Sequence, residues 1–262
     1  VKVSAEVMDK TFDEIRTMLY EELDYKHEAE NLKLFGDYYR DHPYIRVPEL
    51  IENLSAETVL TLTLVEGDRL QDVKSPRYSQ ETINLIGYRI FETFGKQIYE
   101  LGAVHSDPHP GNFAFRPDGT IIIYDFGAVK KIPEETIAKL RSLVADAVAG
   151  RIDTIDQHML DIGVRQPNGE APSPEYYHEW MDIVMQPFQS YESFDFAHTN
   201  LHRRAIGKVK RDGLKYMGSF QPSAETLAVN RVLTGHYWTM VDLGVKASFR
   251  PLIDEIVLKK TA

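Results

Sequence analysis

The segment His105-Ser-Asp-Pro-His-Pro-Gly-Asn112 constrains the fold most, because a loop with two fixed prolines has few conformations. Two short apolar runs follow it, separated by Asp118-Gly119, which is a strong signal for a two-residue β-hairpin turn. The second run leads directly into Asp125-Phe-Gly127. With Asp118-Gly119 as the turn, we expect Asn112 to face Asp125 across the open end of the hairpin.

The polar residues around this hairpin are those that phosphoryl-transfer enzymes use. An amide oxygen from Asn112 and a carboxylate from Asp125 are hard ligands that suit Mg²⁺ carrying nucleotide phosphates. Asp107 precedes them in the proline-rich loop, where we expect it to accept a proton from an attacking hydroxyl or to orient it. A base, an Asn ligand and an Asp-Phe-Gly ligand are the parts of the protein-kinase template. The competing interpretation is an ordinary hairpin that has polar residues at its open end and no catalytic role.

Composition places the chain among globular proteins and narrows its partners. The 262 residues are 43% hydrophobic and 27% charged, with a formal net charge of −10, which argues against a nucleic-acid partner. The absence of cysteine excludes disulfides and thiolate zinc sites. No apolar run approaches the roughly 20 residues that span a bilayer, and no signal peptide opens the sequence. We therefore expect a cytoplasmic protein with at most peripheral membrane contact.

Apolar periodicity predicts a mainly helical chain with a few strands near its start. The expected helices cover residues 9–40, 81–101, 133–150, 153–162, 176–188, 196–217, 222–243 and a short turn from 251. Alternating β-branched residues predict strands at 44–48, 49–51 and 58–65. The last of these ends at Glu66-Gly67, as at the hinge of a bilobal kinase, where backbone groups would hold an adenine ring. An ordinary loop fits this position as well.

Two of the expected helices carry a charged face. Spacings of three and four residues place Glu21, Asp24, Glu28 and Asn31 on one side of the first helix, which predicts a solvated acidic face or a cationic partner. Residues 196–217 are locally basic, and a solvated face is the default interpretation. The alternatives are contact with a substrate headgroup, with an acidic partner or with the acidic helix near Asp24.

Three segments of the sequence resemble the UbiB/AarF family of atypical protein-kinase-like proteins, also called aarF-domain-containing kinases. They are Glu22–Asn31, His105–Asn112 and Asp125–Gly127. The resemblance implies that Asp107 is the catalytic-loop Asp, that Asn112 and Asp125 bind Mg²⁺, and that Glu28 is the helix-C Glu. Glu22 and Asp24 match the family's Glu-x-Asp motif, which faces a Lys-x-Gly-Gln element across the active site.

The resemblance implies both a fold and an activity. We expect an α+β, predominantly helical chain: a protein-kinase-like C-lobe with a helix-C-like N-terminal helix and a partial N-lobe sheet. Residues 1–70 would hold helix C and the N-lobe strands up to the hinge, and residues 71–262 the helical C-lobe with the catalytic loop. The family implies binding of ATP or ADP with Mg²⁺, and ATPase or transferase activity linked to ubiquinone or isoprenoid-lipid biosynthesis. An isoprenoid lipid or quinone-biosynthesis proteins would be its partners.

The sequence departs from the family at its beginning. No glycine-rich nucleotide loop, Lys-x-Gly-Gln element or suitably spaced β-strand Lys precedes Glu22. We therefore expect the helix-C and C-lobe part of a longer protein, with weak or absent turnover alone. A non-catalytic kinase-like scaffold that binds a lipid or protein is the alternative, although joint retention of Asp107, Asn112 and Asp125 favours the enzyme. A relative of aminoglycoside or choline phosphotransferases is the third interpretation, and the Glu22–Asn31 motif argues against it.

Overall fold

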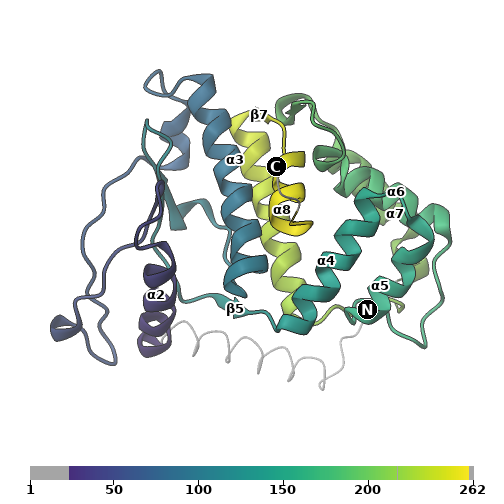
Figure 1. Ribbon diagram of the computed structural model, residues 1–262, viewed down its shortest axis with the longest axis horizontal. Coiled ribbons are helices and arrows are strands. Elements are labelled where there is room, and N and C mark those ends of the chain that lie inside the picture. Colours follow the sequence, from purple (N-terminus) through teal and green to yellow (C-terminus); the bar gives the residue numbers. More distant parts are fainter. Residues whose placement is uncertain (1–23, 217, 260–262) are drawn as a thin grey trace, which may run out of the picture.

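A computed structural model of the 262-residue chain describes residues 24–216 and 218–259. The fold is α+β and predominantly helical, as predicted (Figure 1). The helices are α2 (Tyr25–Tyr39), α3 (Gln80–Lys96), α4 (Glu134–Val148), α5 (Ile155–Asp161), α6 (Pro174–Val184), α7 (Leu201–Tyr216), α8 (Ala224–Leu243) and α9 (Arg250–Leu252). The strands are β1 (Ile45–Arg46), β2 (Ala103–His105), β3 (Phe113–Phe115), β4 (Ile121–Ile123), β5 (Val129–Lys131), β6 (Phe194–Asp195) and β7 (Lys246–Ala247).

The strands form three small sheets. β1 pairs with β4 in parallel, and β3 pairs with β4 antiparallel, so the first sheet has the order β1-β4-β3. β2 pairs with β5, which joins the start of the proline-rich loop to the segment that follows Gly127. β6 pairs with β7 near the end of the chain. The first two sheets therefore hold the loop before β3 and the segment after β4 close to each other.

The hairpin of β3 and β4 differs from its prediction by one residue. Its loop has three residues, 117–119, because Arg116 pairs with Thr120 and Gly119 adopts a left-handed φ of 82°. A type I turn followed by such a glycine is the common three-residue hairpin loop. Asn112 therefore lies opposite Tyr124, whose N–H donates to its backbone oxygen at 3.0 Å. The predicted pairing of Asn112 with Asp125 was wrong.

The predicted strand over residues 58–65 was also wrong. These residues make only isolated bridges, in which Leu62 pairs with Leu50 and Val59 with Ala56. Within the described part of the chain, no strand borders their other edge, and the side chains of Val59 and Leu64 are 51% and 86% exposed. β-Branched residues favour strands only where a sheet and a core are available to receive them.

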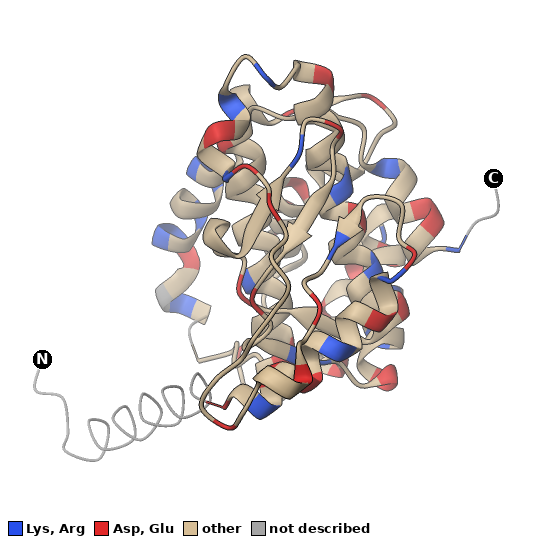
Figure 2. Cartoon of the chain, turned by 90° about the vertical axis from the view of Figure 1, so that its left-hand side faces the viewer, with Lys and Arg blue, Asp and Glu red and all other residues tan. Residues whose placement is uncertain are grey.

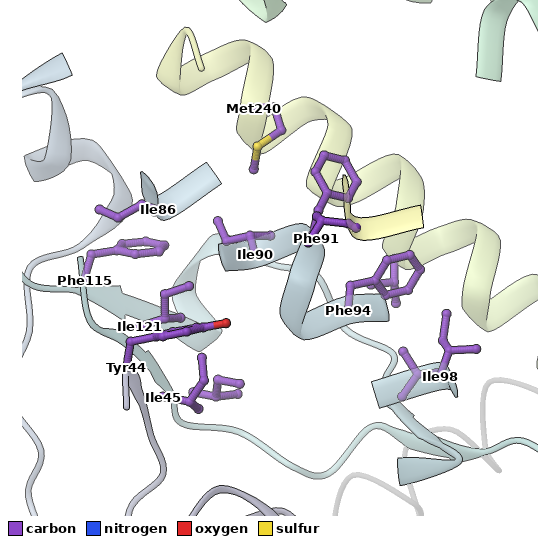
Figure 3. Close-up of a cluster of buried hydrophobic side chains, with 14 of the residues drawn as sticks. Tyr44, Ile45, Ile86, Ile90, Phe91, Phe94, Ile98, Phe115, Ile121 and Met240 are labelled. Carbon is purple, nitrogen blue, oxygen red and sulfur yellow. The ribbon is translucent and has the colours of Figure 1, made fainter. Parts of the chain in front are cut away.

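The core forms around α3, which lies beside α8 at the centre of the molecule (Figure 1). Apolar side chains of α3 meet residues of β3, β4 and α8, and Figure 3 shows this cluster. The helix that apolar periodicity predicts over residues 81–101 is thereby confirmed. Its buried apolar residues include Ile86, Ile90, Phe91, Phe94 and, in the turn that follows, Ile98. The helix continues through a π-helical turn, Gln97–Leu101, to Gly102, whose left-handed φ of 68° ends it. The chain then enters β2 and the proline-rich loop.

The basic helix α7 packs against α6, with one of its cations buried. Lys208 is 3% exposed, and its Nζ lies 3.0 Å from Glu179 of α6 and 3.0 Å from Asp212 of its own helix. Arg211 also pairs with Glu179. The prediction of a solvated basic face is therefore wrong for the side of α7 that carries Lys208. These ion pairs are formed with α6 and within α7, and not with α2. None of the helices that the structure describes has the length and apolarity needed to cross a bilayer.

Helix α8 packs against the proline-rich loop at Gly235. A Cβ atom at this position would lie 2.3 Å from Cγ and 2.4 Å from Cβ of Pro108. Contacts this short do not occur between real atoms, so the glycine is required for the approach of the helix to the loop. One turn earlier in α8, Arg231 donates to Asp107 at 3.1 Å. The helix therefore positions the segment around Asp107.

We expect Gly235→Ala to destabilise the protein, because the added methyl group must displace Pro108. Overpacking of this kind costs about 1–3 kcal/mol of unfolding free energy. Gly207 of α7 has no atom within 4 Å of a built Cβ, so Gly207→Ala is the matched control. It should be neutral or stabilise the helix by up to about 1 kcal/mol. Denaturant unfolding followed by circular dichroism measures both variants, and equal effects would contradict the close packing of α8 on the loop.

Candidate functional site

The proline-rich loop brings Asp107 and Asn112 into direct contact. His109 accepts the N–H of Gly111 through Nδ1 at 3.0 Å, and the backbone of Asn112 donates to the His109 carbonyl at 3.0 Å. These bonds fold the loop into a short turn before β3. In this turn Asn112 Nδ2 donates to Asp107 Oδ2 at 2.7 Å. The predicted base and one predicted metal ligand are therefore neighbours.

Arg231 is a residue of the site that sequence reasoning missed. Its Nη2 donates to Asp107 Oδ1 at 3.1 Å, so both carboxylate oxygens of Asp107 are hydrogen-bonded. The Arg231 side chain is 63% exposed. No local signal relates it to Asp107, since the contact depends on how α8 packs across the loop.

The carboxylates of Asp125 and Glu28 flank the same glycine. Asp125 Oδ1 accepts the N–H of Gly127 at 2.9 Å. A Cβ built on Gly127 would lie 3.4 Å from Asp125 Oδ1 and 3.9 Å from Glu28 Oε2. Burial and the neighbouring charge of Asp125 raise the pKa of Glu28 above its ordinary value, partly offset by the backbone of Phe126. Two acids in this position favour a bound cation.

Phe126 anchors Asp125 from the other side. Its side chain is fully buried, with ring centroids 5.0 Å from Phe35 of α2 and 5.6 Å from His105. The buried Asn31 donates from Nδ2 to the Phe126 carbonyl at 2.9 Å. The predicted acidic face of α2 is thus partly an internal face, because Glu28 and Asn31 both approach the Asp-Phe-Gly segment.

His105 contacts the carbonyl of Asp125. Its Nε2 is in hydrogen-bond contact with the backbone oxygen of Asp125. Because a carbonyl oxygen only accepts, Nε2 must carry the ring proton. Burial lowers the pKa of His105, so the ring is neutral. Its Nδ1 is buried and has no hydrogen-bond partner among the described residues. His105 therefore supports the backbone of Asp125 from the start of the proline-rich loop.

The remaining candidate residues lie further out. The Glu66 carbonyl accepts from Arg116 Nε at 3.0 Å, and the preceding Val65 carbonyl accepts from the Tyr124 hydroxyl at 2.6 Å. The hinge-like segment is thereby attached to the hairpin. Asp24 caps α2, with Oδ1 accepting the N–H of His27 at 3.1 Å. Glu22 lies outside the described residues.

The donor set at the open end of the hairpin suits Mg²⁺. Asn112 Oδ1 and one oxygen of Asp125 have no hydrogen-bond donor among the described residues. An amide oxygen and a carboxylate oxygen are ligands of the type that Mg²⁺ takes together with phosphate and water oxygens. No group of three or more His, Cys, Asp or Glu side chains that could hold a metal ion occurs in the part of the chain that the structure describes. The protein residues therefore fit a cation that arrives with a nucleotide better than a fully protein-bound metal.

The raised pKa of Glu28 predicts an effect of pH on stability. A carboxyl with a raised pKa binds its proton more tightly in the folded state, so stability is lost as pH rises through that pKa. We expect Glu28→Gln to raise the melting temperature at pH 7 and to change it less at pH 4. Glu30→Gln, on the exposed side of α2, is the control. Thermal unfolding at both pH values tests this, and a loss of stability in Glu28→Gln at pH 7 would contradict it.

Residues 2–159, more than half of the chain, match the family described as the ABC1 atypical kinase-like domain. "Protein ACTIVITY OF BC1 COMPLEX KINASE 7, chloroplastic" of Arabidopsis thaliana is 33% identical over 162 residues, which cover 62% of this chain and 23% of that protein. "Atypical kinase COQ8, mitochondrial" of Saccharomyces cerevisiae is 28% identical over 261 residues, which cover 97% of this chain and 50% of that protein. The chain thus spans half or less of these two relatives.

A solved structure has the same fold. It is titled as the complex of Rv3197 with erythromycin, from Mycobacterium tuberculosis. The TM-score is 0.78 at 26% sequence identity, and the match covers 98% of this chain and 62% of that chain. The motif resemblance, the family match and the shared fold agree with one another, and the chain belongs to the ABC1 atypical kinase-like family, the UbiB/AarF group predicted from its motifs.

Proposed function

We propose that this chain carries the Mg²⁺-nucleotide site of an atypical kinase or ATPase. Asp107 is the catalytic Asp, and Asn112 and Asp125 hold the metal. The observation that supports this most is the 2.7 Å hydrogen bond between Asn112 and Asp107, formed where the hairpin to Asp125 begins. A hairpin with only a structural role does not need the amide of Asn112, the carboxylate of Asp125 and the neighbouring acid Asp107 at its open end.

Each residue has a role that its contacts support. Bound Mg²⁺ would neutralise charge on the nucleotide phosphates. Asp107 accepts the proton of the attacking hydroxyl or water, while Asn112 holds one of its oxygens. Arg231 holds the other oxygen through an exposed ion pair, and such pairs contribute only about 0–1 kcal/mol. A substrate hydroxyl can therefore replace Arg231 as the partner of Asp107.

The nucleotide would lie between the loop and the hinge-like segment. In this proposal the backbone at Glu66 holds the adenine ring, and Glu28 acts from α2 beside Asp125. Asp24, which caps that helix, and Glu22, which lies outside the described residues, complete the family's Glu-x-Asp motif in the sequence. Residues 1–70 then supply the helix-C side of the site, and residues 71–262 supply the catalytic loop and the metal ligands.

The family resemblance also suggests the biological setting. We infer a role in ubiquinone or other isoprenoid-lipid biosynthesis, with an isoprenoid lipid, a quinone-biosynthesis protein or water as phosphate acceptor.

A non-catalytic scaffold is the second candidate. It is favoured by the surroundings of Glu28, which has the carboxylate of Asp125 as its charged neighbour and no Lys or Arg partner among the described residues. Nucleotide binding and turnover separate the two candidates.

We expect Asp125→Asn to weaken Mg²⁺-dependent nucleotide binding by more than about tenfold. Residues that only hydrogen-bond to a metal ligand already contribute about tenfold to metal affinity, and a direct ligand contributes more. Isothermal titration calorimetry of the whole natural protein with Mg-ATP measures the change. Asp37→Asn on the exposed surface of α2 is the matched control and should bind as wild type does. Unchanged affinity in Asp125→Asn would remove Asp125 from the ligand set.

We expect Asp107→Asn to abolish ATP hydrolysis while leaving nucleotide binding near wild type. An amide keeps the size of the side chain but accepts no proton from the attacking group. A phosphate-release assay and calorimetry on the same preparation measure the two properties separately. Turnover equal to that of the Asp37→Asn control would exclude the catalytic role of Asp107. An equal loss of binding and turnover would make Asp107 part of the nucleotide site instead.

A further inference from the structure

A large apolar cavity lies between α3, α4, α6, α8 and the turn Ile253–Val257. Its volume is about 610 Å³, within the range of small-molecule sites. None of the described residues that line it is Asp, Glu, Lys, Arg or His. The lining is aromatic and aliphatic, with Thr226 and Asn230 among its few polar side chains. Such a cavity selects a hydrocarbon group and disfavours a nucleotide.

A second apolar cavity of about 300 Å³ adjoins the first. It lies between α6, α7 and α8 and extends the space toward the surface. The two cavities have these lining residues in common: Phe91, Trp180, Val184, Phe188, Asn230 and Leu233. The cavities therefore adjoin across these side chains, and a flexible hydrocarbon chain can extend from one into the other more readily than a compact ring system.

The larger cavity separates two hydrophobic clusters. Ala147, Ile155, Tyr177, Met181 and Met185 form a small cluster apart from the main core around α3. The cavity is lined by members of both, for example Phe91 from the main core and Met181 from the small cluster. A hydrocarbon chain bound there would contact apolar side chains on two sides, which is the arrangement that buries most of its surface.

The mouth of this space is apolar and is bordered by cations. Val184, Ile206, Leu227 and Trp238 line the two cavities and remain 38–51% exposed. Arg203 and Lys210 lie three residues before and four residues after Ile206, so they share its face of α7. Both are exposed, and neither has an ion-pair partner among residues 24–216 and 218–259. In a chain of net charge −10, two such cations beside an apolar opening favour an acidic head group.

We propose that the joined cavities bind an anionic amphiphile with a single long hydrocarbon chain. The chain lies between the two hydrophobic clusters, and the acidic head lies at the mouth near Arg203 and Lys210. The lining residues Thr226, Asn230 and Leu233 lie on the side of α8 opposite Gly235, although Leu227 at the mouth is one turn from Arg231. Neither cavity is lined by Asp107, Asn112 or Asp125, so the site does not depend on the proposed nucleotide site.

Both tryptophans of the chain report on this site. Trp180 lines both cavities and Trp238 lines the smaller one. Titration of the whole protein with 9,10-dibromostearate, below its micelle concentration, should quench tryptophan fluorescence in a saturable manner. Stearate, which carries no bromine, should compete and restore the emission. Asp107→Asn and Asp125→Asn should bind the probe as wild type does, which separates this result from failure of the nucleotide proposal.

Two sets of variants locate the chain and the head group. Val184→Phe with Leu233→Phe fills both cavities and should weaken binding about tenfold or more. Val209→Phe is the matched control, since Val209 is 55% exposed and lines neither cavity. Arg203→Gln with Lys210→Gln changes only the surface. It should weaken binding of dibromostearate several-fold and leave binding of its neutral methyl ester unchanged.

Several results would overturn the proposal. An absence of quenching in wild type would exclude the site. Equal binding by the filled variant and the Val209→Phe control would indicate that the amphiphile only coats the surface. Quenching only by brominated lipid vesicles would indicate a membrane-binding face. A concentration-dependent dimer in sedimentation that stearate does not dissociate would indicate a second copy of the chain as occupant. If the filled variant does not fold by circular dichroism, the surface variant with the acid and its ester decides the question.

Discussion

The burial of Phe126 determines where the groups of the candidate site lie. The ring is held between Phe35 of α2 and His105, and its carbonyl accepts from Asn31. Asp125 is the preceding residue, so its backbone has little freedom once Phe126 is fixed. The same contact draws α2 toward the loop and thereby brings Glu28 to Asp125. One apolar side chain thus brings two acidic residues together, although they lie far apart in the sequence.

The opposite side of the site depends on α8. Gly235 allows the helix to reach Pro108, and Arg231 then reaches Asp107. Because α8 also packs against α3, the loop is supported by the central pair of helices and by α2 together. Figure 2 shows acidic and basic residues interspersed over the face that carries α2. The packing of α8 therefore positions the loop that carries Asp107.

The sequence predicted the elements whose signals are local. The helix expected over residues 81–101 and the proline-rich loop depend on neighbouring residues, and both appear in the structure. The hairpin register failed because Gly119 can occupy either a two-residue or a three-residue loop, and the backbone pairing decides between them. The contact of Arg231 with Asp107 and the burial of Lys208 arise from helix packing, for which the sequence carries no periodic signal.

The buried histidines add no positive charge beside Glu28 and Asp125. Burial lowers the pKa of His105. Burial also lowers the pKa of His236, whose ring contacts Phe113, to about 3. Both rings are therefore neutral at physiological pH, although His105 lies at the Asp125 carbonyl. A protonated imidazole there would neutralise part of the negative charge of Glu28 and Asp125. Because burial disfavours that proton, the repulsion between Glu28 and Asp125 remains, and it adds to burial in raising the pKa of Glu28.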